Sequence, residues 1–187
     1  MVNTFLRPSD LKELRHRNVQ VVHGERDFLR ILPDSSKTEN TPVISMAVAI
    51  KIYEDIIDFQ KANGRGTGKD DFVFFPHLRG EGSKKTKGKD KTNRDYALQT
   101  IRRQFEELLK LAELKCTPTG QPRTLYSLRH TAIMFRLTKG DKIDSLTLAK
   151  KTRTSVEMLE RFYAKHLTPE MNVDKIQSMK KRRVEEL

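Results

Sequence analysis

Two long segments of this sequence place apolar residues at the three- and four-residue spacing of an amphipathic helix. The first runs from 47 to 63 and stops at Gly64, and the second runs from about 94 to 115 and stops at CTPTGQP. Their predicted inward residues are Val48, Ile52, Ile56 and Phe59 in the first segment, and Ile101, Phe105, Leu108, Leu109 and Ala112 in the second. Because side chains return to one face of a helix every 3.6 residues, both segments are predicted to be helices packed on a core.

Three shorter runs before the first of these helices favour β-strands. They are NVQVVH (18–23), DFLRILP (27–33) and TPVISM (41–46), and polar turn sequences separate them. Further helices are expected at 125–139, 145–151 and 155–166, with a last one opening at Thr168. The aromatic run at 70–78 is expected to be extended. The predicted fold is therefore α+β and mainly α-helical, with a small three-stranded antiparallel β-sheet near the N-terminus.

The charge of the chain favours a polyanionic partner. Its 37 Lys and Arg residues against 25 Asp and Glu give a formal net charge of +12. Nucleic acid is a more strongly favoured partner of such a surface than a membrane. No apolar run approaches the roughly 20 residues of a membrane-spanning helix, and the N-terminus lacks the apolar core of a secretory signal. We therefore expect a cytoplasmic protein with neither a membrane partner nor a small-molecule substrate.

The sequence does not indicate a metal site or a bound cofactor. Cys116 is the only cysteine, and the five histidines show no pair at ligand spacing. The glycine-rich GRGTGKDD matches neither the P-loop nor the dinucleotide-binding pattern, and it follows a predicted helix rather than a strand. Its glycines are expected to end that helix.

The segment TLYSLRHTAIMFRL (124–137) contains a feature that packing alone does not explain. Arg129 stands beside Leu128 and close to Ile133 and Met134, where a hydrophobic helix begins. A cation on the inner side of a helix is costly to bury, so a function is expected for it.

Four segments of the chain resemble the motifs of the tyrosine recombinases, the family of phage and transposon integrases and their relatives. LYSLRHT resembles the second arginine box of the family, FLRPSDL its first arginine box, SSKTENTPVISM its β-hairpin lysine, and RTSVEMLERFYAKHL its tyrosine box. These segments follow the order of the family, and Tyr163 lies 34 residues after Arg129, a typical interval. The resemblance covers nearly the whole chain from Arg7 and corresponds to the catalytic domain. The chain is thus expected to be a single catalytic domain, 1–187, from a longer protein.

The resemblance implies a role for each of four residues in cutting and rejoining DNA. Tyr163 would attack the phosphodiester and form a 3′-phosphotyrosyl intermediate, without metal or nucleotide. Arg7 and Arg129 would hold the non-bridging oxygens, since a guanidinium offers paired donors and stays charged. Lys37 would protonate the leaving 5′ oxygen. The catalytic candidates are completed by Tyr126 and Thr154.

Tyr126 and Thr154 depart from the usual pattern of the family. Tyr126 stands where the family most often has the first histidine of its second arginine box, and Thr154 stands where it most often has histidine or tryptophan. A tyrosine can donate a hydrogen bond to phosphate but is a poor general base. Thr154 with Glu157 is also spaced as a helix-capping box. His130 points about 100° around the helix from Arg129 and is expected to be a structural residue in the interior.

Each candidate also has a structural interpretation. Arg7 could simply pair with Asp10 or Glu13, and Arg129 could form a surface salt bridge. Lys37 could be solvated in a polar turn, and Tyr163 could pack on the core as a helix aromatic.

Two segments are expected to lie outside the minimal catalytic domain. Residues 79–95 form a predicted flexible basic loop, which is either solvated or in contact with phosphates beside the active site. Residues 168–187 form a C-terminal helix or tail that docks on its own domain or on a neighbour in a homo-oligomer on DNA. The expected function is that of a site-specific recombinase or integrase of bacterial or phage origin, associated with the nucleoid. The alternative is a catalytically degenerate, DNA-binding module with the same fold.

Overall fold

The computed structural model describes residues 1–34, 41–78, 84–86, 89–139, 143–163 and 177. Lys37 and the predicted C-terminal helix or tail, apart from residue 177, lie outside the described residues.

The predicted three-stranded sheet is present near the N-terminus. Its strands are β1 (Val19–Val22), β2 (Phe28–Ile31) and β3 (Val43–Ile44), in the order β1-β2-β3 with both pairs antiparallel. In β2, Leu29 and Ile31 are buried and Arg30 is exposed, so side chains alternate between the core and solvent.

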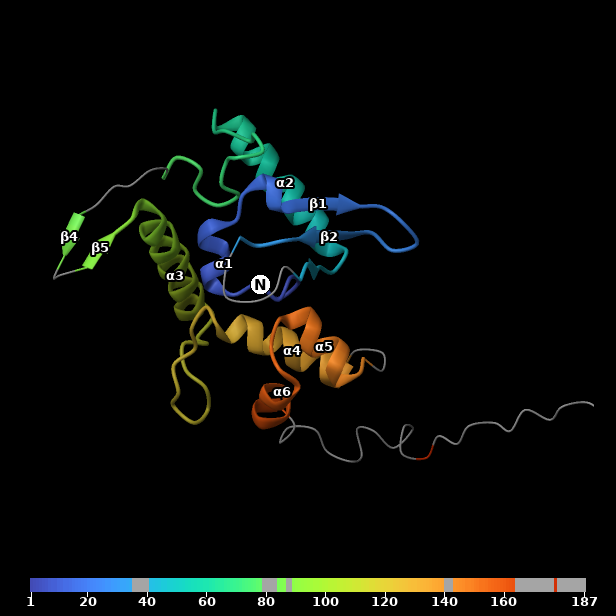
Figure 1. Cartoon of the computed structure of the whole chain (residues 1–187). Helices are drawn as coiled ribbons and strands as arrows, with labels where there is room; N and C mark the ends of the chain where they lie inside the picture. Colours follow the sequence, from blue (N-terminus) through green and yellow to red (C-terminus); the bar gives the residue numbers. More distant parts are fainter. Residues whose placement is uncertain (35–40, 79–83, 87–88, 140–142, 164–176, 178–187) are drawn as a thin grey trace, which may run out of the picture.

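Six α-helices and one 3-10 turn are described around this sheet (Figure 1). They are α1 (Pro8–Glu13), η1 (His16–Asn18), α2 (Val48–Ala62), α3 (Asn93–Leu111), α4 (Ser127–Lys139), α5 (Ser145–Thr152) and α6 (Val156–Tyr163). The described bounds of α2, α4 and α5 lie within two residues of the predicted ones. The α3 helix ends four residues earlier than predicted. None of the described helices combines the length and the apolar composition that a bilayer span requires.

Hydroxyl side chains cap the N-termini of α3 and α6. In the first turn of α3, Thr92 accepts a hydrogen bond from the Asp95 amide, and the Asp95 carboxylate accepts one from the Thr92 amide at 2.9 Å. At α6, the Ser155 hydroxyl accepts a hydrogen bond from the Met158 amide at 3.1 Å. The predicted capping role of Thr154 is therefore wrong, because Ser155 occupies that position.

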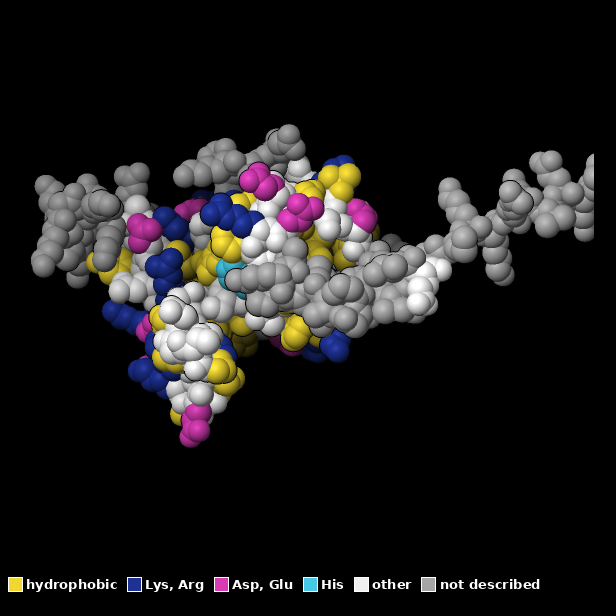
Figure 2. All heavy atoms as spheres, turned by 90° about the horizontal axis from the view of Figure 1, so that it is seen from below, with side chains coloured by type: hydrophobic (Ala, Val, Ile, Leu, Met, Phe, Trp, Pro, Cys, Tyr) yellow, Lys and Arg dark blue, Asp and Glu magenta, His cyan; other side chains and the backbone are white. Residues whose placement is uncertain are grey.

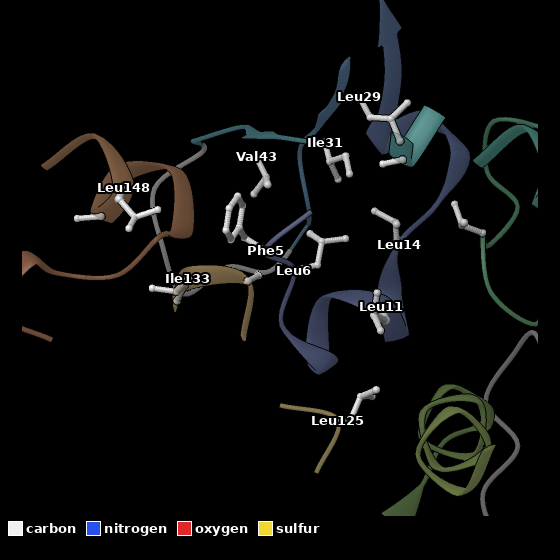
Figure 3. Packing of buried hydrophobic residues seen from close by; sticks show 14 of the residues in the cluster. Phe5, Leu6, Leu11, Leu14, Leu29, Ile31, Val43, Leu125, Ile133 and Leu148 are labelled. Atoms are coloured by element: carbon white, nitrogen blue, oxygen red, sulfur yellow. The ribbon is translucent and has the colours of Figure 1, made fainter. Parts of the chain in front are cut away.

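The hydrophobic core forms around the N-terminal segment. Phe5 lies between Val43 of the sheet and Ile133 of α4, and Leu6 lies toward Ile31 and the other side of the core (Figure 3). All five of these residues are buried, and each large apolar side chain contributes about 1.5–3 kcal/mol when fully buried. The segment before α1 is thus fixed between the sheet and α4.

The predicted inward face of α2 is wrong. Val48, Ile52 and Phe59 are exposed, whereas Ala49 and Gln60 are buried. The Gln60 side chain donates a hydrogen bond to the Val73 carbonyl at 2.8 Å and contacts His16 at 3.0 Å. These polar contacts hold the buried face of α2, and apolar spacing alone could not indicate them.

The predicted inward face of α3 is correct for Ile101, Phe105 and Leu109, which pack on the core, and wrong for the other two residues. Leu108 and Ala112 are exposed, while Ala97, Leu98 and Leu109 are buried.

Part of the predicted basic loop is a short hairpin. Strands β4 (Lys84–Thr86) and β5 (Lys89–Lys91) pair antiparallel and lead directly into α3 (Figure 1). The predicted extended segment 70–78 has no strand, but Phe72 forms one isolated bridge with Arg15.

Candidate active site

Arg129 is one of the most deeply buried side chains of the described chain. It lies in the first turn of α4 and is 2% exposed. Its Nη1 donates to the Phe5 carbonyl and its Nη2 to the Thr152 carbonyl. Since no carboxylate among the described residues forms an ion pair with it, the surface salt bridge considered for Arg129 is wrong. The guanidinium instead connects the segment before α1 with the end of α5.

Arg7 approaches the same turn of the chain from the N-terminal end of α1. Its Nη2 donates to the Arg153 carbonyl at 2.6 Å. The sequence also allowed an ion pair between the Arg7 side chain and Asp10 or Glu13, but the carbonyl contact is the one observed. Asp10 accepts a hydrogen bond from the Arg7 backbone amide at 2.7 Å, and its carboxylate forms an ion pair with Arg153. The two arginines of the predicted site are therefore held by the consecutive carbonyls of Thr152 and Arg153.

Arg153 is a component of the site that the sequence did not indicate. It is buried and has a left-handed backbone with φ of 50°, a conformation that non-glycine residues seldom adopt. Its ion pair with Asp10 joins the turn between α5 and α6 to α1, across 143 residues of sequence. No local pattern in the sequence marks such a contact.

Tyr163 is the last described residue of α6 and is buried in the core cluster. Its hydroxyl lies 2.5 Å from Nδ1 of His130, and the two rings are 5.6 Å apart between centroids. Burial raises the pKa of Tyr163 to about 12, while the nearby charge of Arg129 acts in the opposite direction. Tyr163 thus both packs on the core and presents its hydroxyl beside the buried cation.

His130 is exposed, so the prediction that it is an interior structural residue is wrong. Its ring contacts the Tyr126 ring edge-to-face at 5.0 Å as well as Tyr163. Partial desolvation of the ring, followed by the charge of Arg129, lowers the pKa of His130 below its ordinary value. The angular separation from Arg129 around the helix did not predict where the His130 side chain lies, because His130 extends toward α6 while Arg129 extends toward the core.

Tyr126 and Thr154 border this group. Tyr126 is 42% exposed, precedes α4, and its hydroxyl interacts favourably with the Arg129 charge. Thr154 is half-buried and directly follows Arg153, and its backbone amide donates to the Ala149 carbonyl at 3.0 Å. Both residues therefore lie next to the arginines, whereas Lys37 is outside the described residues.

The electrostatics of the group favour an anion. Burial lowers the pKa of Arg129; the Tyr126 hydroxyl opposes this effect, and the charges of Arg7 and Arg153 add to it. One carboxylate, Asp10, faces these three cations through its pair with Arg153. A phosphate oxygen beside Arg7 and Arg129 would relieve their mutual repulsion.

The face of the molecule seen from below includes a histidine side chain, and most of the visible lysine and arginine side chains lie to its left (Figure 2). Acidic side chains are interspersed among them.

The described residues contain no candidate metal centre. Among them, no group of three or more His, Cys, Asp and Glu side chains could hold a metal ion, and Cys116 is exposed.

One solved structure similar to this chain is that of the Tn1549 transposon integrase in complex with transposon right end DNA. The TM-score is 0.50 and the sequence identity is 20%. The match covers 94% of this chain and 55% of the integrase chain, so this chain spans little more than half of that length. No family model matches the sequence, and no curated protein matches it. The predicted α+β fold of a tyrosine recombinase catalytic domain is confirmed by this likeness.

Proposed function

We propose that this chain is the catalytic domain of a DNA strand transferase, which cuts and rejoins double-stranded DNA through a covalent 3′-phosphotyrosyl intermediate on Tyr163. One observation carries the proposal. Two arginines distant in the sequence, Arg7 and Arg129, are bound to adjacent carbonyls, and the charge of Arg129 acts on the Tyr163 hydroxyl. A packing arginine would not need a second arginine and a nucleophile beside it.

In this proposal, Tyr163 supplies the attacking oxygen and the arginines stabilise the negative charge that develops on the phosphate. Tyr126 and Thr154 donate hydrogen bonds to the same oxygens, and Lys37 protonates the leaving 5′ oxygen. The DNA complex of the similar integrase supports duplex DNA as the partner. A protein with this activity would work beside the nucleoid, and several copies of it on one DNA would allow strand exchange.

Covalent trapping tests the proposal. The wild-type chain and Tyr163→Phe are incubated with a pool of nicked duplexes of randomised sequence, at concentrations that give equal gel-shift occupancy. We expect a protein–DNA adduct that survives denaturant with the wild type and none with Tyr163→Phe, because the phenylalanine has no oxygen to attack phosphorus. Tyr96→Phe, on half-buried Tyr96 of α3, is the matched control and should form the adduct normally.

The outcomes separate the enzyme from a binding module. An adduct that persists in Tyr163→Phe would remove Tyr163 as the nucleophile. Salt-sensitive binding with no adduct from the wild type at any sequence would identify a non-catalytic DNA-binding module instead.

A further inference from the structure

We infer that His130 is the general base that takes the proton from the Tyr163 hydroxyl, an assignment that rests on the proposed function. Neither the residue pattern nor the resemblance assigned His130 a chemical role.

The geometry places an acceptor directly on the nucleophile. His130 Nδ1 lies 2.5 Å from the Tyr163 hydroxyl, within hydrogen-bonding reach of the proton that has to leave. The contact joins α4 to α6, and the neighbouring Tyr126 ring lies edge-to-face against the imidazole at 5.0 Å. The ring of His130 is thus flanked by two tyrosines, one of which carries the reacting oxygen.

The nucleophile needs such a base. Because burial raises the pKa of Tyr163 to about 12, only about one molecule in 10⁵ carries a phenolate at pH 7. Proton removal during attack avoids this unfavourable pre-equilibrium.

His130 is suited to accept the proton. Partial desolvation and then the charge of Arg129 lower the pKa of His130, so the ring is neutral near pH 7. With Nε2 carrying the ring proton, Nδ1 is a free acceptor. The titratable groups that face the ring within the described residues are Tyr126 and Arg129 of the α4 region and Tyr163 of α6. None of them is a carboxylate that would hold the imidazole protonated.

The other groups of the described site cannot accept the proton of the Tyr163 hydroxyl. The guanidinium groups of Arg7 and Arg129 do not give up their protons at working pH, and Tyr126 is a phenol of weak basicity. His16, the other histidine with a tyrosine contact, is bound to Tyr53 and Gln60 on α2.

The step is balanced in both directions. The Tyr163 proton passes to His130 Nδ1 while the phenolic oxygen bonds to phosphorus, the bond from phosphorus to the 5′ oxygen breaks, and that oxygen takes a proton from the general acid. In rejoining, a 5′ hydroxyl attacks the phosphotyrosine and gives its proton back to the conjugate base of the general acid. The bond between phosphorus and the Tyr163 oxygen breaks, and His130 returns its proton to the departing phenolate.

The test is the pH dependence of adduct formation in a single turnover on the nicked duplex pool. Wild type, His130→Ala and His130→Gln are compared at equal DNA occupancy, and His23→Gln, at an exposed histidine of the β1–β2 turn, is the matched control. In both His130 variants, we expect adduct formation near pH 7 to be slower by about 10²- to 10⁴-fold. The wild-type rate should rise with pH and level off, with its midpoint shifted below the ordinary histidine pKa, whereas the variant rates should keep rising as hydroxide replaces the base.

The glutamine variant distinguishes a base from a positioning residue. Glutamine can keep a hydrogen bond to the hydroxyl but cannot take up its proton, so a His130→Gln rate close to wild type with an unchanged pH profile would overturn the inference. Thermal melting and gel shifts of each variant verify folding and binding, and His130→Gln decides the matter if His130→Ala does not fold. If the wild type itself forms no adduct, the proposed function fails. If the wild type forms the adduct and the His130 variants form it at the same rate, this inference alone fails.

Discussion

At the scale of single residues, Arg153 combines an unfavourable backbone with a favourable buried contact. Its left-handed backbone costs on the order of 1 kcal/mol or more for a residue with a Cβ. Its guanidinium and the Asp10 carboxylate, both almost fully buried, form an ion pair. Breaking a buried pair by removing one charge leaves the other without compensation, at a cost of about 3–5 kcal/mol. The pair therefore fixes the turn whose carbonyls hold Arg7 and Arg129.

This balance predicts a non-additive pair of substitutions. Asp10→Asn should lower the free energy of unfolding by about 3 kcal/mol, because Arg153 remains buried and charged. Arg153→Gly relieves the backbone conformation but leaves the Asp10 carboxylate buried, so it should also destabilise. The double variant should recover a large part of either loss, since neither charge of the pair remains buried without its partner and glycine suits the turn. Urea unfolding of the four proteins measures these differences.

An exposed ion pair provides the control. Glu107→Gln, which removes the partner of Lys110 on the surface of α3, should change the free energy of unfolding by less than about 1 kcal/mol. If the losses of Asp10→Asn and Arg153→Gly simply add in the double variant, the two residues do not stabilise the protein as a pair.

The sequence singled out Arg7, Arg129, Tyr126, Thr154 and Tyr163 as candidate site residues, because each stands in a recognisable motif, and their chemical roles stay predictions. The structure shows that Arg7 and Arg129 bind consecutive carbonyls. The sequence did not predict the contacts of His130 and Arg153. Those contacts depend on where α4, α6 and α1 meet in space, and on a backbone conformation that leaves no signature in a single sequence. The chemistry of Lys37 stays a prediction.

At the scale of elements, α1 and α3 are joined by charged contacts. Lys12 Nζ lies 2.7 Å from the Asp95 carboxylate, and Arg94 Nε donates to the Lys12 carbonyl at 2.7 Å. Arg94 is buried and its guanidinium carbon lies 3.7 Å from the centre of the Phe72 ring. Since Arg7 directly precedes α1, these contacts also fix the site at a distance.

The Lys12–Asp95 pair predicts a pH-dependent stability. The Lys12 hydrogen bond, with that of the Thr92 amide, lowers the pKa of Asp95 from 3.8 to about 2. A carboxyl group with a depressed folded-state pKa stabilises the protein above its unfolded pKa, and the contribution is lost as pH falls from about 4 to about 2. Because the Asp95 side chain is 38% exposed, solvent screening reduces the contribution to about 1 kcal/mol.

Asp95→Asn should therefore lower the free energy of unfolding by about 1 kcal/mol near pH 7, and the difference from wild type should shrink below about pH 4. Urea unfolding across this range measures it. Asp55→Asn, at the exposed Lys51–Asp55 pair of α2, is the control and should show a smaller difference near pH 7. A difference for Asp95→Asn that is constant between pH 7 and pH 3 would exclude the ion pair as its cause.

The elements themselves were largely predictable, while the orientation of α2 was not. Apolar spacing located α2 within one residue at each end, because the helical period extends over fifteen residues. The same spacing selected Ile52 and Phe59 as inward residues, yet both are exposed. The buried face instead combines Ala49 and Ile56, which pack on the core, with Gln60, whose amide satisfies the carbonyl of Val73 from a distant segment. Polar contacts of this kind depend on tertiary structure and override a weak amphipathic pattern.

At the scale of the whole molecule, the net charge of +12 is larger than the positive charge that the site arginines supply. Four lysines belong to the short hairpin, at positions 84 and 85 of β4 and 89 and 91 of β5. The hairpin leads into α3, whose N-terminal turn is attached to α1 through Asp95 and Lys12. Phosphate binding by the hairpin would thus add DNA affinity on an element connected to the site.

Replacing these four lysines by glutamine should weaken duplex binding and reduce the slope of log affinity against log salt by about 0.9 for each phosphate that the variant no longer binds. The matched control replaces Lys51, Lys61, Lys69 and Lys110, which are exposed on other surfaces, so that both variants lack the same four charges from the total of +12. We expect the hairpin variant to lose more affinity and more slope than the control. Because the hairpin lysines lie outside the proposed active site, the rate of adduct formation per bound complex should be retained. Equal losses in both variants would mean that the hairpin lysines contribute only to the overall charge and are otherwise solvated.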